Sequence, residues 1–188
     1  IKTGFYGLDR ALQGNNLGEL TVLAGESNDG KSTICRQIAS YNVKNGVGVG
    51  AVFGEETPER FMDESIRQCY IGREHRTMSG KTEWGDPIYE PSKETEARWR
   101  EEFGKNINLF QIDKVRDSDK IGDKIFDWMN HCAEIENKHL FIIDNLMKIT
   151  VDETSEEWVA QAKFIERLYR FAQKKLVHVI LVVHTKKI

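Results

Sequence analysis

The eight residues GESNDGKS, Gly25 to Ser32, constrain the fold more than any other part of this chain. They match the pattern GxxxxGK[ST] at every fixed position, after an apolar run that starts at Gly18 and before a helical pattern that reaches Val43. Glycines let the backbone curl so that successive N–H groups point at a phosphate, and the helix that begins near Gly30 adds the positive end of its dipole. The pattern therefore predicts a phosphate-binding loop between a strand and a helix.

The residue types in this loop assign roles. Lys31 can reach the β- and γ-phosphates of a nucleotide, and the hydroxyl of Ser32 can ligate Mg²⁺. The predicted nucleotide-binding residues are Gly25, Glu26, Ser27, Asn28, Asp29, Gly30, Lys31, Ser32 and Thr33. We expect ATP, or another nucleoside or deoxynucleoside triphosphate, as the substrate and Mg²⁺ as the cofactor.

Apolar runs alternate with helical patterns along most of the chain, and its length suits a single domain, residues 1–188. Strands are expected at 18–25, 49–54, 107–112, 140–143 and 179–183, and helices at 31–43, from 57, at 121–135 and at 158–176. This alternation predicts an α/β fold with a mostly parallel, twisted sheet and helices on both faces. Residues 73–92, which hold two of the three prolines, are expected to form a flexible surface loop, and residues 93–105 a solvated helix.

Acidic residues end two of the expected strands. Asp144 follows four apolar residues and is predicted to hold the metal through water. The next residue is Asn145, whose amide cannot act as a general base, so the base that hydrolysis needs must come from elsewhere. Glu55 and Glu56 end another strand at the edge where a parallel sheet presents its active site. Two adjacent acids point in roughly opposite directions, so only one can face the nucleotide. The alternative is that both cap the helix that begins at Pro58.

A histidine ends the last expected strand. His184 lies in the sequence VVHTKK, at the same edge of the sheet. A polar side chain at this position can form a hydrogen bond with the γ-phosphate and respond to its presence. The alternative is a structural histidine whose hydrogen bonds are satisfied within the protein.

Composition limits the remaining function classes. The formal net charge is −3, so a nucleic-acid site would have to be local. The longest apolar stretch, Val177 to Val183, is too short to cross a bilayer, and the first residues form no signal region. Three cysteines without a CxxC pair predict neither a zinc site nor a disulfide framework, and reduced thiols fit a cytoplasmic protein. The missing initiator Met predicts a fragment of a longer chain.

Together these motifs resemble the RecA-like P-loop ATPase core, and their details are similar to the DnaB-type replicative helicases, especially the branch of phage primase-helicases and mitochondrial Twinkle. TGFYGLDRAL resembles the TGxxxLD segment that precedes the phosphate loop in that family. GEE, at 54–56, resembles its LEE or LEM segment, and VVHTKK resembles the sensor motif of the phage and mitochondrial branch, where the bacterial branch carries Gln. The resemblance covers nearly the whole chain except residues 73–92.

The resemblance implies a role for each matching position. It assigns catalysis to Glu55, Lys31 and His184, metal binding to Ser32 and Asp144, and contact with DNA to Lys186. It implies an ATP-driven motor that forms a homo-hexamer in the full-length protein, translocates on single-stranded DNA and works with other replication proteins in the cytoplasm of a bacterial or phage-infected cell. The family continues past the sensor strand into a DNA loop, further strands and an arginine finger. The chain is therefore expected to be a truncated core with weak hydrolysis.

Two other interpretations stay open. A RecA- or RadA-type recombinase would form filaments and pair DNA strands, and the segment before the phosphate loop is nearly as compatible with it. A KaiC-like nucleotide switch would act on protein partners and would turn over ATP without DNA. His184 and the GEE segment favour the helicase.

Overall fold

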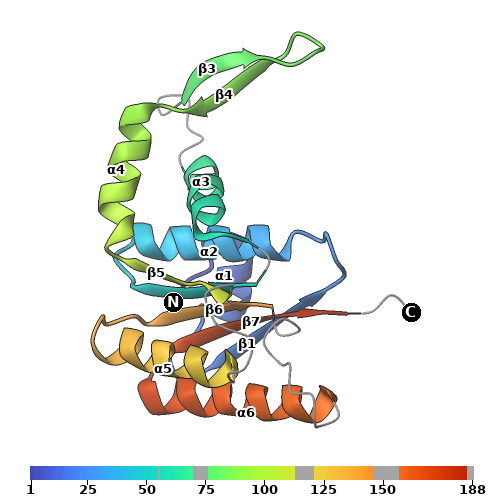
Figure 1. Cartoon of the computed structure of the whole chain (residues 1–188), viewed down its shortest axis with the longest axis vertical. Coiled ribbons are helices and arrows are strands. Elements are labelled where there is room, and N and C mark those ends of the chain that lie inside the picture. The colour runs from blue at the N-terminus through green and yellow to red at the C-terminus, as the bar shows by residue number, and fades with distance from the viewer. Residues whose placement is uncertain (55, 70–75, 113–120, 146–156, 186–188) are drawn as a thin grey trace.

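The computed structural model describes residues 1–54, 56–69, 76–112, 121–145 and 157–185 (Figure 1). Its elements, in chain order, are α1 (Tyr6–Leu12), β1 (Leu20–Gly25), α2 (Lys31–Lys44), β2 (Val49–Phe53), α3 (Pro58–Cys69), β3 (Arg76–Lys81), β4 (Pro87–Pro91), α4 (Lys93–Gly104), β5 (Ile107–Phe110), α5 (Ile121–Glu134), β6 (Leu140–Asp144), α6 (Glu157–Lys175) and β7 (His178–His184). None of the helices in these ranges combines the length and the apolarity that crossing a membrane requires.

Five strands form one parallel sheet in the order β1-β7-β6-β2-β5. Helices α1 and α2 lie over one face and α5 and α6 over the other, with α3 stacked outside α2 (Figure 1). Successive residues of one strand therefore enter different cores: Ala51 packs in the cluster on the α2 side, and Val52 in the cluster on the α5–α6 side. Burial on both faces explains why the central strands are continuous apolar runs, and the expected α/β architecture is confirmed.

The carboxyl ends of the strands meet at one edge of the sheet because all five strands run in the same direction. The register pairs Gly25 with His184 at the ends of β1 and β7, and Phe53 with Asp144 at the ends of β2 and β6. Residues that are far apart in the sequence thus come together where open α/β sheets bind their ligands.

The expectation of a loop over residues 73–92 is wrong for its described part. β3 and β4 pair antiparallel and project from the body of the molecule as a hairpin (Figure 1). Its turn is closed by the N–H of Thr82, which donates to the carbonyl oxygen of Asp86 over 2.8 Å. The guanidinium of Arg76 lies over the ring of Tyr89, 4.3 Å from its centroid. Neither face of the hairpin is buried, so its sequence lacks the apolar alternation by which a strand is normally recognised.

Helix α4 is more deeply packed than the expected solvated helix. Trp99 is only 1% exposed, and its ring stacks on that of Phe103 with centroids 4.9 Å apart. The hydroxyl of Ser92 accepts the N–H of Thr95 and caps the first turn. The buried stripe of α4 is narrow, and charged residues around it dominate the composition, which explains the error.

The burial of Trp99 predicts a large effect on stability. Trp99→Ala should lower the free energy of unfolding by about 3–5 kcal/mol, because it removes a large side chain from the core and leaves a cavity. Arg98→Ala, at an exposed neighbouring position, should change it by no more than about 0.5 kcal/mol. Urea unfolding of both variants measures the difference, and equal midpoints would contradict the packing described for α4.

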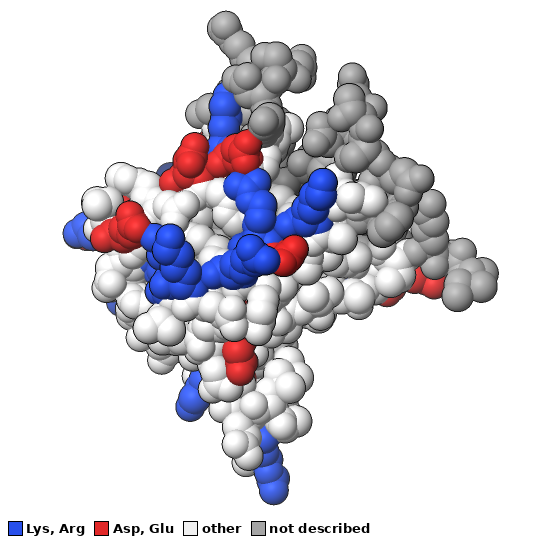
Figure 2. Space-filling view, turned by 90° about the horizontal axis from the view of Figure 1, so that it is seen from below, with Lys and Arg blue, Asp and Glu red and all other residues white. Residues whose placement is uncertain are grey.

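Basic side chains gather on the outer face of the α5–α6 layer, which faces the viewer in Figure 2. Helix α6 contributes the exposed residues Lys163, Arg167, Arg170 and Lys174. Two of them already have acidic partners: Arg167 pairs with Asp123 over 2.7 Å and Arg170 with Glu166 over 2.5 Å. Charge alone therefore assigns this face no role in binding nucleic acid.

Candidate nucleotide-binding site

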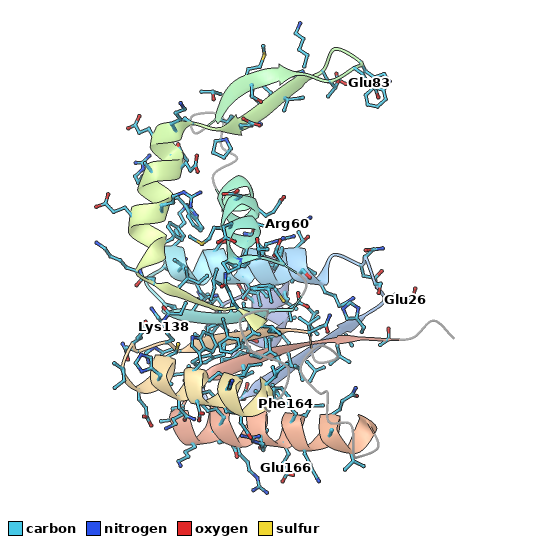
Figure 3. All side chains as sticks on the ribbon, in the orientation of Figure 1. Glu26, Arg60, Glu83, Lys138, Phe164 and Glu166 are labelled. Carbon is cyan, nitrogen blue, oxygen red and sulfur yellow. The ribbon has the colours of Figure 1, made fainter. Side chains whose placement is uncertain are left out.

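The predicted phosphate loop connects β1 to α2 at the carboxyl edge of the sheet. Asn28 and Gly30 adopt positive φ angles of 69° and 80°, which turn the chain tightly into the first residue of α2. The carboxylate of Asp29 folds back and accepts the N–H of Glu26 over 2.7 Å. Glu26 itself lies at the end of the molecule where β7 finishes (Figure 3). The loop is thus closed by its own hydrogen bonds, and its remaining N–H groups and the amino end of α2 suit an anion.

Lys31, the first residue of α2, is held inside this loop. Its side chain is only 6% exposed, and its ammonium group donates to the main-chain carbonyl oxygen of Glu26. A buried ammonium group needs such a partner, and the carbonyl keeps the positive charge beside the curled backbone. The structure thus places a nearly buried positive charge beside the predicted phosphate loop.

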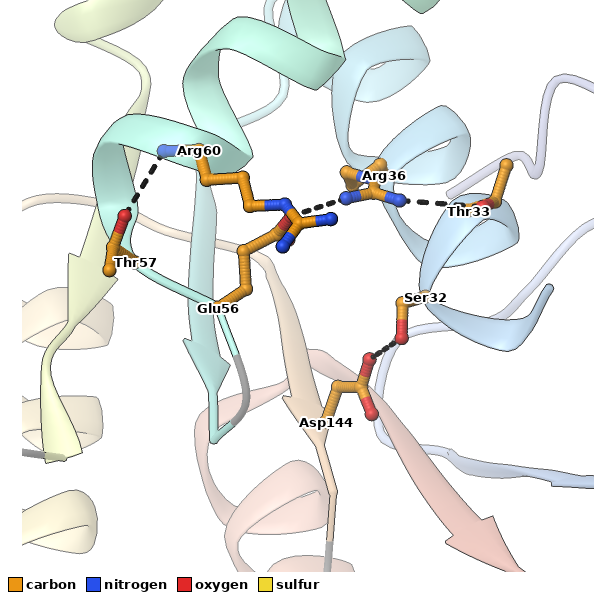
Figure 4. Close-up of polar contacts among 7 residues, drawn as sticks. All are labelled: Ser32, Thr33, Arg36, Glu56, Thr57, Arg60 and Asp144. Carbon is orange, nitrogen blue, oxygen red and sulfur yellow. Dashed lines mark hydrogen bonds and ion pairs between the residues drawn. The ribbon is translucent and has the colours of Figure 1, made fainter. Parts of the chain in front are cut away.

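Ser32 and Asp144 meet across the edge of the sheet (Figure 4). The hydroxyl of Ser32 donates to the carboxylate of Asp144 over 2.5 Å, although 112 positions separate the two residues in the sequence. Asp144 is buried at the end of β6, and its main-chain carbonyl accepts the N–H of Gly54 over 2.6 Å. A hydroxyl and a carboxylate are the oxygen ligands that Mg²⁺ prefers, and Mg²⁺ in nucleotide sites takes few protein ligands besides water and phosphate. The donor set therefore fits Mg²⁺.

The two adjacent glutamates differ in what the structure says of them. Glu56 is turned toward α2, with its Oε1 2.5 Å from Nη1 of Arg36 and 3.6 Å from Nε of Arg60. Burial raises the pKa of its carboxyl group, and the two arginines oppose that rise. The hydroxyl of Thr57 accepts the N–H of Arg60 over 3.2 Å and caps α3, so the alternative that both acids cap this helix does not hold for Glu56. Glu55 lies outside the described residues.

Strand β7 carries two histidines in different environments. The Nδ1 of His178 donates to the carbonyl of Asn16 over 2.8 Å, its Nε2 accepts the hydroxyl of Thr21 over 3.1 Å, and burial lowers its pKa. His184 is half-buried beside Gly25, and its Nδ1 is a buried atom without a hydrogen-bond partner among the described residues. His178 is thus a satisfied structural histidine, whereas His184 keeps hydrogen-bonding capacity at the edge of the phosphate loop.

Of the six residues predicted to act in catalysis, metal binding or DNA contact, the structure brings four together, and two lie outside the described residues. Those at the common edge are Lys31, Ser32, Asp144 and His184. Glu55 and Lys186 lie outside the described residues. Sequence reasoning missed Arg36, which approaches both Glu56 and the hydroxyl of Thr33. The sequence feature that could have identified Arg36 is its position one helical turn after Ser32, on the same face of α2.

Comparison with known proteins defines the fold further. No family model matches the chain. The whole chain matches a solved structure of an ATPase domain with a TM-score of 0.74 at 16% identity, and covers 64% of that chain. It also matches, over its whole length, a DnaB-like replicative helicase whose structure was studied for its interactions with primase, with a TM-score of 0.74, 16% identity and 44% of that chain covered. The present chain therefore spans less than two thirds of either protein. Its α/β fold therefore matches that of an ATPase domain and of a DnaB-like replicative helicase, and the fold class predicted from the sequence is confirmed.

Proposed function

We propose that this chain is the ATP-binding and ATP-hydrolysing motor core of a ring-forming replicative helicase that translocates on single-stranded DNA. The observation that carries the proposal is the convergence of a phosphate-loop lysine, a serine–aspartate pair and a histidine at the carboxyl edge of one parallel sheet. The likeness in fold to an ATPase domain and to a replicative helicase supports it independently, because it extends over the whole chain.

The binding step follows from the loop. The N–H groups of the loop and the amino end of α2 bind the phosphates, and Lys31 moves its ammonium from the carbonyl of Glu26 to the phosphate oxygens. Ser32 and Asp144 would hold Mg²⁺, which neutralises charge on the β- and γ-phosphates when it is bound. Before binding, their hydrogen bond keeps both oxygen ligands at the same place, so little reorganisation is needed.

The hydrolytic step needs a base that orients the attacking water. Glu56 is engaged by two arginines and is turned toward α2. We therefore propose Glu55 as the general base. This assignment rests on the strand-end position of Glu55 in the sequence and on the engagement of its neighbour.

His184 is proposed as the sensor of the γ-phosphate. It lies beside Gly25, and its Nδ1 has capacity for one more hydrogen bond. Lys186, two residues further on, is the proposed contact with single-stranded DNA. Loss of the γ-phosphate would release His184 and shift the residues after it, which couples hydrolysis to movement on DNA.

His184→Ala is expected to separate nucleotide binding from the response to DNA. Affinity for ATP should change little, because the phosphate loop is intact. The rate stimulated by DNA should fall by about 10- to 100-fold, since one hydrogen bond that strengthens in the transition state is lost. Steady-state hydrolysis with saturating single-stranded DNA measures this, with His131→Ala, an exposed histidine on α5, as the control. Unchanged stimulation in His184→Ala would remove the sensor role.

The proposal extends to the oligomeric state, the partners and the cellular location of this motor. We propose a homo-hexamer in the full-length protein, since a ring lets six copies surround one strand of DNA. One of the two similar proteins is a helicase studied with a primase, and we propose replication proteins of that kind as partners here. The proposed location is the cytoplasm of a bacterial or phage-infected cell.

An assay on two DNA substrates tests the helicase against its rivals. The protein is incubated with ATP and either a forked duplex or a pair of homologous single and double strands. Unwinding of the fork without strand pairing is the expected result. Pairing without unwinding would replace the helicase with a recombinase, and neither activity, together with turnover that ignores DNA, would identify a nucleotide switch that acts on protein partners.

A further inference from the structure

A nearly buried ion pair joins α2 to the connection between β2 and α3 (Figure 4). Nη1 of Arg36 lies 2.5 Å from Oε1 of Glu56, and the two side chains are only 12% and 10% exposed. Nη2 of Arg36 donates to the hydroxyl of Thr33 over 3.4 Å, so the same guanidinium reaches back to the first turn of α2. Arg60 contacts Glu56 from the solvent side, at 3.6 Å.

The hydrogen bonding of this pair is incomplete. Nε of Arg36 and Oε2 of Glu56 are buried, and neither has a hydrogen-bond partner among the described residues. Burying two charges costs free energy that their attraction recovers fully only when the remaining donors and acceptors are also satisfied. Burial also raises the pKa of Glu56, which shows that its surroundings oppose the ionised form. The pair is therefore not expected to add much to the free energy of unfolding. Its position in the fold points instead to a role in holding the nearby backbone.

The geometry ties one short segment at two points. The N–H of Gly54 donates to the main-chain carbonyl of Asp144 over 2.6 Å, which fixes the segment to β6. Two residues later the carboxylate of Glu56 fixes it to Arg36 on α2. The two anchors lie only two positions apart in the sequence, so both act on the same short connection between β2 and α3. Asp144 also accepts the hydroxyl of Ser32, so the residue that anchors Gly54 is one of the two proposed metal ligands.

We infer that Glu56 is a positioning residue: through Arg36 it holds the connection between β2 and α3 against the first turn of α2, and it does not react with the nucleotide itself. The catalytic consequence rests on the proposed function, because Glu55, the proposed general base, directly precedes Glu56 in the sequence. Loss of the pair is therefore expected to slow hydrolysis, whereas nucleotide binding depends on the phosphate loop and should be spared.

The test compares Glu56→Gln, Arg36→Met and the double variant with wild-type protein. Glu56→Gln keeps the shape of the side chain and removes its charge, and Glu59→Gln, an exposed acid in the first turn of α3, is the matched control. Three quantities are measured: hydrogen exchange of the peptide that spans residues 54–60, the affinity for a fluorescent ATP analogue, and kcat with single-stranded DNA.

In each single variant, exchange of the 54–60 peptide should rise about tenfold, because the segment opens locally. The value of kcat should fall by about 10- to 100-fold, since small displacements of a catalytic group cost that much, while affinity should stay within about threefold of wild type. The double variant should be no worse than either single variant, because both remove the same interaction. Glu59→Gln should match wild type.

Three other outcomes are informative. Unchanged exchange in both single variants would show that the pair does not hold the segment, and raised exchange with unchanged kcat would show that it does so without consequence for catalysis; either overturns the inference. If wild-type protein hydrolyses no ATP, the proposed function fails, and the exchange data still decide whether Glu56 and Arg36 hold the segment.

Discussion

Lys31→Ala is expected to weaken the binding of ATP at least a hundredfold. The ammonium group is held inside the phosphate loop by the carbonyl of Glu26, so the side chain brings a nearly buried positive charge to the place where the phosphates are proposed to bind. Removing a buried charge that meets a charged ligand costs about 3 kcal/mol, which corresponds to roughly a hundredfold in affinity. Titration with a fluorescent ATP analogue in the presence of Mg²⁺ measures the change directly.

A comparison separates this effect from unfolding. Lys163→Ala removes an exposed lysine from α6, on the layer opposite α2, and should bind the analogue as tightly as wild type. Thermal unfolding without nucleotide should give similar midpoints for both variants, since the contact with Glu26 is a single hydrogen bond. If Lys31→Ala bound ATP as well as Lys163→Ala does, the loop would not be the nucleotide site.

Glu55→Gln is expected to stop hydrolysis and to spare binding. A glutamine keeps the size of the side chain and cannot accept the proton of the attacking water. Loss of general base catalysis lowers rates by about 10²–10⁴-fold, whereas affinity should stay within about threefold of wild type because the phosphate loop is untouched. Single-turnover hydrolysis of radiolabelled ATP, with binding measured in parallel, tests both parts.

The neighbouring acids provide the control for this prediction. Glu59→Gln should hydrolyse ATP at the wild-type rate, and Glu56→Gln should fall between the two, since we assign it a positioning role only. Substantial turnover in Glu55→Gln would mean that the base lies elsewhere, and a complete loss in Glu56→Gln alone would move the assignment to Glu56.

Much of the fold could be predicted from the sequence because its signals are local. Strands β2 and β6 are buried on both faces, so they are unbroken apolar runs between glycines, prolines and polar residues. Their polar ends were predicted to meet because parallel strands end at one edge. The structure places Asp144 at the end of β6, with its carboxylate against the hydroxyl of Ser32 in the first turn of α2. The chemical roles of both residues stay predictions.

The features that could not be predicted from the sequence either lack a buried face or depend on contacts between different helices and strands. The β3–β4 hairpin has no buried face and is held by its backbone, so no side-chain pattern marks it. Helix α1 has no buried residue and thus no apolar stripe. The pairing of Arg36 with Glu56, and of Gly25 with His184, follows from how strands and helices are placed beside each other, which spacing within one element does not reveal.

Steady-state ATP hydrolysis by the full-length protein, measured with and without single-stranded DNA, decides whether this fold works as a DNA motor. A motor core whose histidine and following residues respond to the γ-phosphate should hydrolyse ATP faster when single-stranded DNA is present, saturably with DNA concentration, and Lys31→Ala should abolish both rates. ATP hydrolysis that single-stranded DNA does not change, or no hydrolysis even though ATP binds, would contradict the account of this chain as a DNA motor.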